Sequence, residues 1–532
     1  MKHFNVTFEP DNRQISIHAG ATLIEAAGRA GIVLNTVCGG KGICRKCLVN
    51  VQPDSKEVLA CQYHIQSDLT VTILPASRFF EQQILAEGIA GKTKVQPDIY
   101  QKYRKPDSTT PIFGAAVDIG TTTVVARLFD MTDGRCAATE AGLNPQARFG
   151  DDVISRIGYA QTDEKLAELR KVIIDYINEL IGRLCRQASI DSNDIYEISV
   201  VGNTTMNHIF LKLPITQLGQ APYKAFSLDA HDCSADQLGL YINPAGNIHT
   251  VENIAGFVGA DTTAVALATG IDSAEQITLA VDIGTNGEIV LAARDKLYAA
   301  SCAAGPAFEG ARISCGSRAV EGAIQAVVIN DSDIDLDVIG TAPARSICGS
   351  GLIDAVAVML DLGIIDPTGR FVGPQELEGR LPPVVFSRII EHAGQPAFVL
   401  AAARQAAANE VILTQRDIRQ VQLAKAAIRA GITLLEKKLA LEDADIEKIL
   451  LAGAFGNYIC AESALRMGLL PDVPAERIHF VGNAACSGAE MVLLSSRCRA
   501  HAKELARKIQ YVEIAHEKHF SDVFADSMAF RA

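Results

Sequence analysis

The string Ala116-Val-Asp-Ile-Gly-Thr121 recurs letter for letter as Ala280-Val-Asp-Ile-Gly-Thr285, and this repetition decides the fold of most of the chain. Each copy lies between apolar stretches that are typical of strands. A long amphipathic helix is expected after each copy, followed by an apolar strand that ends at Gly202 in the first case and at Gly453 in the second. The same elements in the same order, twice, predict a duplicated α/β unit.

Each copy also predicts a strand–turn–strand that binds phosphate. The backbone N–H groups and hydroxyls of such a turn can surround phosphate oxygens, while its aspartate faces Mg²⁺ through water. One copy alone is weak evidence, because hairpin turns favour Asp and Gly. Two copies in register predict two loops that face each other across a cleft. For the glycine-rich turn Gly453–Gly456, two interpretations stay open: adenine lying flat against the backbone, or an ordinary strand-to-helix turn.

Together, these elements resemble the superfamily of acetate and sugar kinases, Hsp70 and actin. The resemblance implies two RNase H-like α/β halves with ATP between them, and it indicates the residues of the site. Asp118 and Asp282 are the candidate catalytic residues. The candidate nucleotide-binding residues are Gly120, Thr121, Thr122 and Thr123 in the first loop, Gly284, Thr285 and Asn286 in the second loop, and Gly453, Ala454, Phe455 and Gly456 in the adenosine motif.

Two further features concern a hinge and an insertion. Pairs of small residues predict two helices that cross closely as the hinge: Ala255-Gly256 with Gly259-Ala260, and Ala484-Ala485 with Gly488-Ala489. In the first repeat, the aspartate and the strand-end glycine are 84 positions apart, but in the second repeat they are 171 positions apart. The second half therefore carries an insertion.

Four of the 13 cysteines form a cluster with the spacing Cys38-x5-Cys44-x2-Cys47-x13-Cys61. Four thiolates can hold a 2Fe–2S cluster, two on each iron. The glycines of the string CGGKGIC allow the tight loop that such a cluster needs. A structural zinc site and four unrelated thiols are the alternatives. Zinc fits less well, because it usually takes its ligands as two short pairs.

The sequence on either side of the cysteines agrees with a ferredoxin. Alternating apolar residues around Asp11–Asn12 predict a hairpin, and the stretch from Thr22 to Ala30 predicts a short helix that Thr22 caps. Residues 1–75 closely resemble the 2Fe–2S ferredoxin family, which implies a β-grasp fold. The first gap between cysteines has five residues instead of the plant-type four, a variation that leaves this interpretation intact.

A ferredoxin domain in front of this ATPase fold resembles the reductive activators of corrinoid proteins. The strings DIGTNGEI, AGPAFEGA, ICGSGLID and LAGAFGNYI carry most of the resemblance. We expect a ferredoxin domain at 1–75, a linker at 76–111, a middle domain at 112–275 and a C-terminal ATPase-like domain at 276–532. The resemblance implies ATP-dependent transfer of one electron to an inactive Co(II) corrinoid protein of a methyltransferase system. It also implies a 2Fe–2S cluster, ATP and Mg²⁺ as cofactors.

The sequence leaves several points open. An upstream low-potential electron donor is expected, and a homodimer is one option for the oligomeric state. Glu309 and Arg312 are candidates for contacts with the nucleotide or with the corrinoid partner, or for an internal ion pair. Three other functions remain as alternatives: activation of a radical acyl-CoA dehydratase or reductase, sugar-type kinase activity, and a nucleotide-gated redox-sensing scaffold.

The composition argues against two further classes of function. The net charge is −13 and the chain has no basic block, so it offers no surface for nucleic acid. The chain shows neither an N-terminal secretory signal nor an apolar run of about 18 residues, the least that a membrane span needs. We therefore expect a cytoplasmic protein without a membrane segment.

Overall fold

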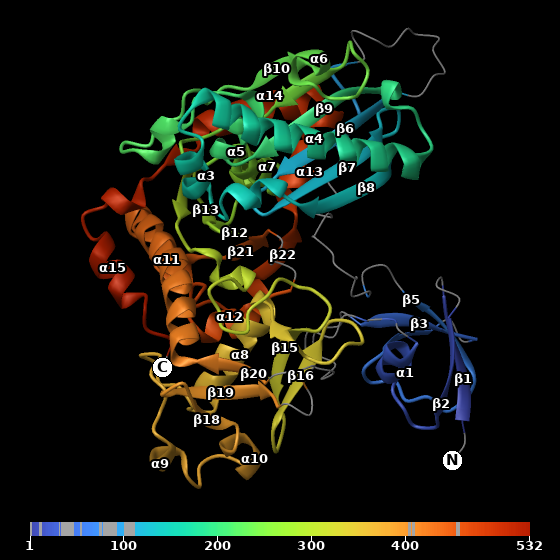
Figure 1. The fold of residues 1–532 in the computed structure, drawn as a ribbon, viewed down its shortest axis with the longest axis vertical. Coiled ribbons are helices and arrows are strands. Elements are labelled where there is room, and N and C mark those ends of the chain that lie inside the picture. Colours follow the sequence, from blue (N-terminus) through green and yellow to red (C-terminus); the bar gives the residue numbers. More distant parts are fainter. Residues whose placement is uncertain are drawn as a thin grey trace.

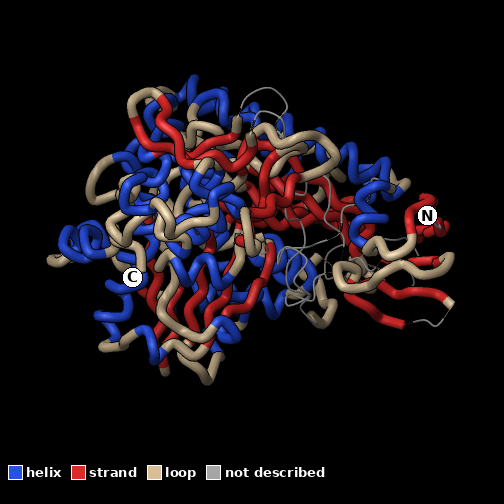
Figure 2. The backbone as a smooth tube through the Cα atoms, turned by 90° about the horizontal axis from the view of Figure 1, so that it is seen from below, coloured by secondary structure: helices blue, strands red, loops and turns tan. Residues whose placement is uncertain are grey.

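The computed structural model describes residues 3–9, 13–30, 32, 34, 47–53, 56–73, 77, 93–99, 112–402, 406, 410–453 and 458–531. Figure 1 shows a small N-terminal domain beside a larger body, and the two repeats lie at the upper and middle levels of that body. Figure 2 shows the same arrangement from below, with helices covering both sides of the large sheets. Among the described residues, no helix has both the length and the apolar character that crossing a membrane requires.

The N-terminal domain is a five-stranded sheet in the order β2-β1-β5-β3-β4 with one helix packed on it. Strand β1 pairs antiparallel with β2 and parallel with β5, which is the β-grasp arrangement that the sequence predicted. The backbone N–H of Glu25 donates to Thr22 Oγ1 at 3.2 Å, so the predicted helix cap is confirmed. The elements are β1 (His3–Glu9), β2 (Arg13–His18), α1 (Leu23–Arg29), β3 (Leu48–Gln52), β4 (Lys56–Leu59) and β5 (Leu69–Ile73).

The middle domain is a six-stranded sheet in the order β10-β11-β9-β6-β7-β8. Helix α4 is the predicted amphipathic helix, and its apolar stripe is buried against this sheet. The elements are β6 (Phe113–Ile119), β7 (Thr123–Asp130), β8 (Cys136–Leu143), α3 (Val153–Tyr159), α4 (Asp163–Ala188), β9 (Ile195–Gly202), α5 (Thr204–Leu211), β10 (His231–Ser234), α6 (Ala235–Leu238), β11 (Asn247–Thr250) and α7 (Ala260–Thr269).

The C-terminal domain repeats this plan with a sheet in the order β22-β21-β12-β13-β14-β23. Five consecutive strands correspond one to one with those of the middle domain, so the predicted duplication is confirmed. The elements of this repeat are β12 (Thr278–Ile283), β13 (Gly287–Ala293), β14 (Lys296–Cys302), α11 (Gln415–Leu439), β21 (Lys448–Ala452), α12 (Ala461–Arg466), β22 (Ile478–Gly482), α13 (Ala484–Leu494), α14 (Ser496–Lys508), β23 (Gln510–Tyr511) and α15 (Phe520–Asp526).

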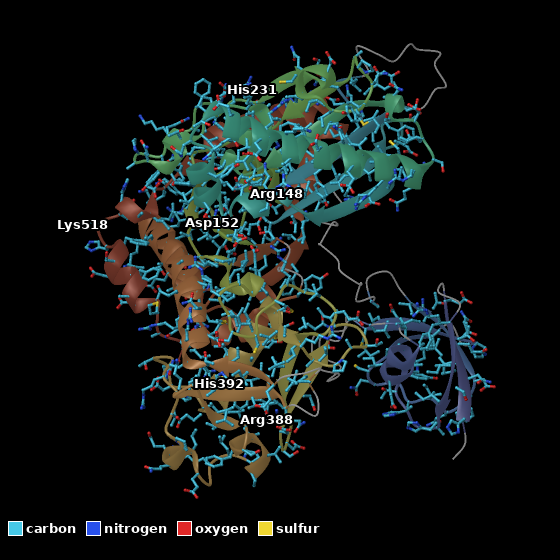
Figure 3. The ribbon with its side chains drawn as sticks, viewed as in Figure 1. Arg148, Asp152, His231, Arg388, His392 and Lys518 are labelled. Atoms are coloured by element: carbon cyan, nitrogen blue, oxygen red, sulfur yellow. The ribbon has the colours of Figure 1, made fainter. Side chains whose placement is uncertain are left out.

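The predicted insertion lies between β14 and α11 and forms two small sheets. Arg388, labelled in Figure 3, ties the two sheets together: its Nη2 donates to Asp333 Oδ2 at 2.6 Å and its Nη1 to the carbonyl oxygen of Leu400 at 2.8 Å. The elements are β15 (Ala323–Ile329), β16 (Ile334–Val338), β17 (Ser346–Ile347), α8 (Gly349–Asp361), α9 (Pro374–Leu377), α10 (Pro383–Phe386), β18 (Ile389–His392), β19 (Gln395–Ala401) and β20 (Val411–Thr414).

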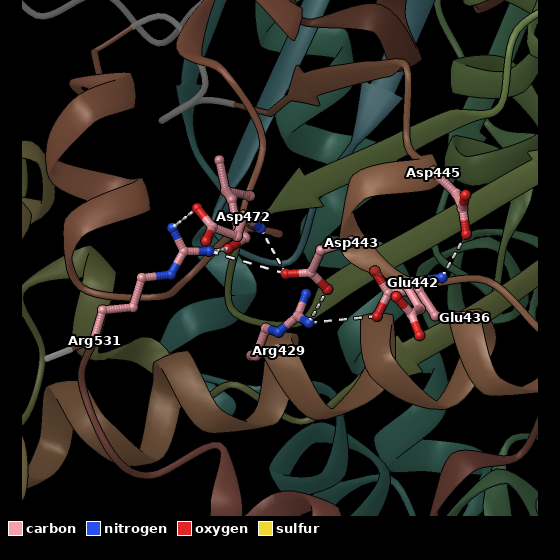
Figure 4. A network of polar contacts seen from close by, with 8 residues as sticks. Arg429, Glu436, Glu442, Asp443, Asp445, Asp472 and Arg531 are labelled. Carbon is pink, nitrogen blue, oxygen red and sulfur yellow. Dashed lines mark hydrogen bonds and ion pairs between the residues drawn. The ribbon is translucent and has the colours of Figure 1, made fainter.

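The C-terminal residues are fastened to α11 by charged side chains, as Figure 4 shows. Arg531 Nη1 donates to Asp472 Oδ1 at 2.9 Å, while Arg429 on α11 pairs with Asp443. Lys425, one turn before Arg429, is buried beside these arginines, and burial together with their charges lowers the pKa of Lys425 to about 8. Asp443 also lies 4.0 Å from Arg531 Nη2, so it connects the C-terminal residues to Arg429 on α11.

Part of the predicted linker packs against the C-terminal domain. The backbone N–H of Gln96 donates to the carbonyl oxygen of Leu494 at 2.8 Å, and the N–H of Ser496 donates back to the carbonyl oxygen of Gln96 at 3.0 Å. Ile99 is buried in the same core as α13 and α14. Residues 93–99 are therefore anchored at the junction between these two helices.

Helices α7 and α13 cross so closely that the contact leaves no room for a side chain. A Cβ atom on Gly488 would lie 2.2 Å from the carbonyl oxygen of Ala264, closer than any real contact. The second set of small residues therefore serves the close crossing that the sequence predicted. The first set does not: Gly256 packs on the carbonyl oxygen of Tyr223 and Gly259 on the backbone of Asn203 and Thr204, both before α7 begins at Ala260. Both helices pack between the two large sheets, and they share one core with residues from both.

We predict that Gly488→Ala will destabilise the protein by about 1–3 kcal/mol, because the added methyl group forces the two helices apart. The matched control is Gly158→Ala in α3, where a Cβ atom would meet nothing within 4 Å. Urea unfolding followed by circular dichroism measures both variants. Equal stability of the Gly488→Ala variant and the unaltered protein would show that the crossing tolerates a wider spacing.

Candidate functional site

A cavity of about 450 Å³ lies between the two repeated loops. Both loops and the strand-end glycine of β21 line this cavity, so the structure brings together the predicted residues that it describes. These residues are Asp118, Gly120, Thr121, Thr122 and Thr123, then Asp282, Gly284, Thr285 and Asn286, and finally Gly453. Ala454, Phe455 and Gly456 lie outside the described residues.

The register of each hairpin sets the position of the aspartate in its loop. Asp118 pairs with Val125 across β6 and β7, and Asp282 pairs with Glu288 across β12 and β13. Both aspartates thus lie at the same end of their sheets, facing the cavity. Gly453 has φ +89°, and a Cβ atom there would lie 2.3 Å from Asp282 Oδ1. A glycine is required at this position because the carboxylate of Asp282 lies against the backbone.

Four carboxyl groups line the cavity, and burial is the main reason that their pKa values are raised. Burial, followed by the charges of Asp261 and Asp282, raises the pKa of Asp118 to about 7, although a hydrogen bond from Asn483 opposes the shift. Burial and the charge of Asp261 raise the pKa of Asp282 to about 7. Burial raises the pKa of Asp261 to about 6 and that of Glu288 well above its usual value.

Such a group of oxygen ligands fits a divalent cation of the Mg²⁺ type, which binds through a few carboxylates and keeps several waters. Sequence reasoning identified Asp118 and Asp282 but missed Asp261 and Glu288. Glu288 follows Asn286, the last residue of the second loop, by two positions in the string DIGTNGE, so its spacing offered a signal. Asp261 is the second residue of α7, and its role depends on how that helix packs.

Two helix N-termini are held at the first loop by asparagine side chains. Asn203 caps α5 and donates to Thr121 Oγ1 at 2.9 Å. Asn483 caps α13 and donates to Asp118 Oδ2 at 3.2 Å. The exposed backbone N–H groups and the dipole of a helix N-terminus favour anions such as phosphate. The string VGN precedes both helices, at 201–203 and 481–483, and was a signal that the sequence analysis did not use.

Two buried side chains also hold the backbone of the first loop in place through hydrogen bonds. Asn144 Nδ2 donates to the carbonyl oxygen of Gly120 at 2.8 Å, and Arg156 Nη2 donates to the carbonyl oxygen of Thr121 at 2.6 Å. Arg156 is fully buried, and this burial lowers its pKa to about 10. These two donors satisfy the carbonyl oxygens of Gly120 and Thr121 and thereby fix the backbone of the loop.

Glu309 joins the two loops across the cavity. Thr122 Oγ1 donates to Glu309 Oε2 at 2.8 Å, Thr285 Oγ1 donates to Glu309 Oε1, and the two hydroxyl oxygens are 3.3 Å apart. The sequence left Glu309 open between a nucleotide or partner contact and an ion pair. Its hydrogen bonds in fact go to one hydroxyl from each loop.

The cysteine site is described in part. Strands β3 and β4 pair with Leu48 opposite Leu59, and the backbone N–H of Ala60 donates to the carbonyl oxygen of Cys47 at 2.9 Å. This register brings Cys47 and Cys61 to the same end of the hairpin, and both are buried. Two buried thiols at one end of a hairpin fit a cluster that takes its ligands from this hairpin. Cys38 and Cys44 lie outside the described residues.

Comparison with known proteins assigns the three parts of the chain. Residues 4–74 match the 2Fe-2S iron-sulfur cluster binding domain, residues 113–274 the RACo middle region, and residues 276–532 the C-terminal domain of RACo, the ASKHA domain. The corrinoid activation enzyme RamQ of Eubacterium limosum is 34% identical, and the match covers 99% of each chain. The chain belongs to the RACo family of corrinoid activators. This membership confirms the predicted family and the predicted fold class.

Two further RACo-type relatives agree with this membership. The [Co(II) methylated amine-specific corrinoid protein] reductase of Methanosarcina barkeri is 25% identical over 79% of this chain and 77% of its own length. The solved structure of a reductive activator for corrinoid, iron–sulfur protein superposes with a TM-score of 0.73 and 32% identity, and it covers 99% of this chain and 98% of its own. The predicted domain boundaries at 75, 111 and 275 stay predictions.

The raised pKa values predict a pH effect on stability. A carboxyl group whose pKa rises from 3.8 unfolded to about 7 folded stabilises the protein below about pH 4, and this contribution is lost as the pH rises through 7. We therefore expect Asp282→Asn to stabilise the nucleotide-free protein relative to the unaltered one, by an amount that grows between pH 4 and pH 7 and then levels off.

Thermal unfolding across pH 4–8 without nucleotide or divalent cation measures this difference. Asp295→Asn, at an exposed turn of the same sheet, is the matched control and should show no such trend. If the midpoint of thermal unfolding differed between Asp282→Asn and the unaltered protein by the same amount at every pH, the raised pKa of Asp282 would be contradicted.

Proposed function

We propose that this chain is an ATP-dependent reductive activator, which passes one electron from a 2Fe–2S cluster to an inactive Co(II) corrinoid protein and so restores Co(I) for methyl transfer. The observation that carries the proposal is the combination within one chain of a cysteine-bearing β-grasp domain and a cavity between two phosphate-type loops. The names of the relatives in two organisms support the corrinoid protein as the target.

The two parts answer one energetic problem. Reduction of Co(II) to Co(I) requires a potential lower than a plant-type cluster, at about −400 mV, supplies readily. Each 100 mV of deficit costs roughly 2.3 kcal/mol per electron. A nucleotide-driven change of conformation can meet a cost of this size by favouring the productive complex. A cluster alone would not supply enough free energy to reduce Co(II), and a nucleotide site alone would supply no electron.

The residues take the following proposed roles. Asp118 and Asp282 would hold Mg²⁺, and the hydroxyls and backbone N–H groups of the two loops would bind the phosphates of ATP. Gly453 to Gly456 form the adenosine contact. Cys38, Cys44, Cys47 and Cys61 hold the cluster, which when bound supplies a one-electron carrier. An upstream low-potential donor reloads it, and the cytoplasm is the compartment that keeps these thiols reduced.

The cluster assignment predicts a coloured protein with about two irons per chain. Cys47→Ser should bleach the visible absorbance, because a buried hydroxyl is a poor substitute for a soft thiolate ligand. Cys185→Ser, which alters a buried thiol of α4 in the middle domain, is the matched control and should keep the colour. Four irons per chain, or zinc in place of iron, would contradict the assignment.

The coupling predicts that Mg-ATP is required for net reduction. The chemically reduced protein is mixed with a Co(II) corrinoid protein from the same organism, and the Co(I) spectrum is followed with and without Mg-ATP. Most corrinoid should stay Co(II) until Mg-ATP is added. Asp282→Asn should keep the cluster spectrum but lose both ATP hydrolysis and Co(I) formation, whereas Asp295→Asn should behave as the unaltered protein.

Two outcomes would overturn parts of this proposal. Formation of Co(I) at the same rate and extent without nucleotide would remove the coupling and leave only electron transfer. Absence of Co(I) with every corrinoid protein of the organism would favour the alternative, an activator of an acyl-CoA dehydratase or reductase.

A further inference from the structure

The carboxylate of Glu309 bridges the two loops at the wall of the cavity. Thr122 belongs to the first loop and Thr285 to the second, and each hydroxyl donates to a different oxygen of this one carboxylate. Glu309 is only 9% exposed, and it lines the same cavity as both threonines. An anionic group with two oxygens thus bridges the two loops, whose hydroxyl oxygens are 3.3 Å apart.

Both hydroxyls are engaged by this arrangement. A threonine hydroxyl has a single hydrogen to donate, so the donor that serves Glu309 cannot at the same time serve another acceptor. The terminal phosphate of a nucleotide is also an anion with several oxygen acceptors, and in a site of this kind it lies between the two loops. The carboxylate and a terminal phosphate would therefore compete for the same donors, and their like charges exclude joint occupancy.

We infer that Glu309 holds the place of the terminal phosphate of ATP, so that a nucleoside triphosphate must displace this side chain whereas a diphosphate need not. The inference rests on the proposed binding of nucleotide in this cavity. It makes Glu309 a residue that determines how the site distinguishes ATP from ADP.

Backbone contacts connect Glu309 to strand β17, which lies further along the insertion. Glu309 ends the short helix Pro306–Glu309, which is bounded by Gly305 at φ +75° and Gly310 at φ +79°. A Cβ atom on Gly310 would lie 2.2 Å from the carbonyl oxygen of Ser317, so the two segments are in close contact. The N–H of Ser317 in turn donates to the carbonyl oxygen of Ile347 at 2.9 Å, directly before α8.

The test compares the affinities for a non-hydrolysable Mg-ATP analogue and for Mg-ADP by calorimetry. Glu309→Ala removes the competitor, so the affinity for the triphosphate should rise roughly ten- to a hundredfold, which is the effect of freeing hydrogen bonds to a charged group. The affinity for Mg-ADP should change less than about twofold by comparison. Glu309→Gln keeps an acceptor but loses the charge, so it should also raise the affinity for the triphosphate analogue, but by a smaller factor.

Glu490→Gln is the matched control. Glu490 on α13 pairs with Arg127 on β7, so it also joins the two halves but does not line the cavity. If the loss of any contact between the two halves raised the affinity for the triphosphate, Glu490→Gln would raise it as much as Glu309→Ala does. That result, or equal changes for both nucleotides in the Glu309 variants, would overturn the inference while the proposed function stands.

A second measurement does not depend on the stability of any variant. In the unaltered protein, the triphosphate analogue should increase hydrogen exchange at the amide of Ser317 relative to ADP, because the displaced segment contacts it. Equal exchange with both nucleotides would contradict the displacement. If the unaltered protein bound neither nucleotide, the proposed function itself would fail, and the inference with it.

Discussion

The close crossing of α7 and α13 is the constraint on which the rest of the structure depends. Since Gly488 admits no side chain against Ala264, the two helices can lie between the two sheets and share one core. This crossing sets the distance between the repeats, and thereby the distance between the two loops. It also aims both helix N-termini at one cavity, with Asp261 in the first turn of α7 and Asn483 at the cap of α13.

A second consequence of this crossing is electrostatic. Bringing the repeats together buries four carboxyl groups in one cavity, and this burial raises their pKa values: those of Asp118, Asp261, Asp282 and Glu288. The ionised form of these carboxyl groups is therefore unfavourable in the empty cavity, and a divalent cation bound there would stabilise it. Because the carboxyl groups lose stability as they ionise, a cation that bound only the folded protein would add stability to it.

The sequence predicted the parts of the fold that rest on local pattern. The repeated string identified both loops, the amphipathic stripes predicted α4 and α11, and the small residues at 484–489 predicted one side of the crossing. It could not predict the role of Glu309, because the partner Thr122 lies 187 positions away and only the packing of the insertion brings them together. Asp261 was missed because its place at the cavity depends on how α7 packs. The docking of residues 93–99 was also missed, since a proline-containing stretch without periodicity is typical of a linker.

That docking has a consequence for the geometry of electron delivery. The chain between the end of β5 at Ile73 and the anchor at Gln96 can span at most on the order of 80 Å, whereas the chain from Ile73 to the start of β6 at Phe113 could span on the order of 140 Å. The contact of Gln96 with Leu494 and Ser496 thus roughly halves the tether of the cluster domain and places its origin at the end of α13. A shorter tether confines an electron donor to a smaller volume, which raises its effective concentration at any acceptor within reach.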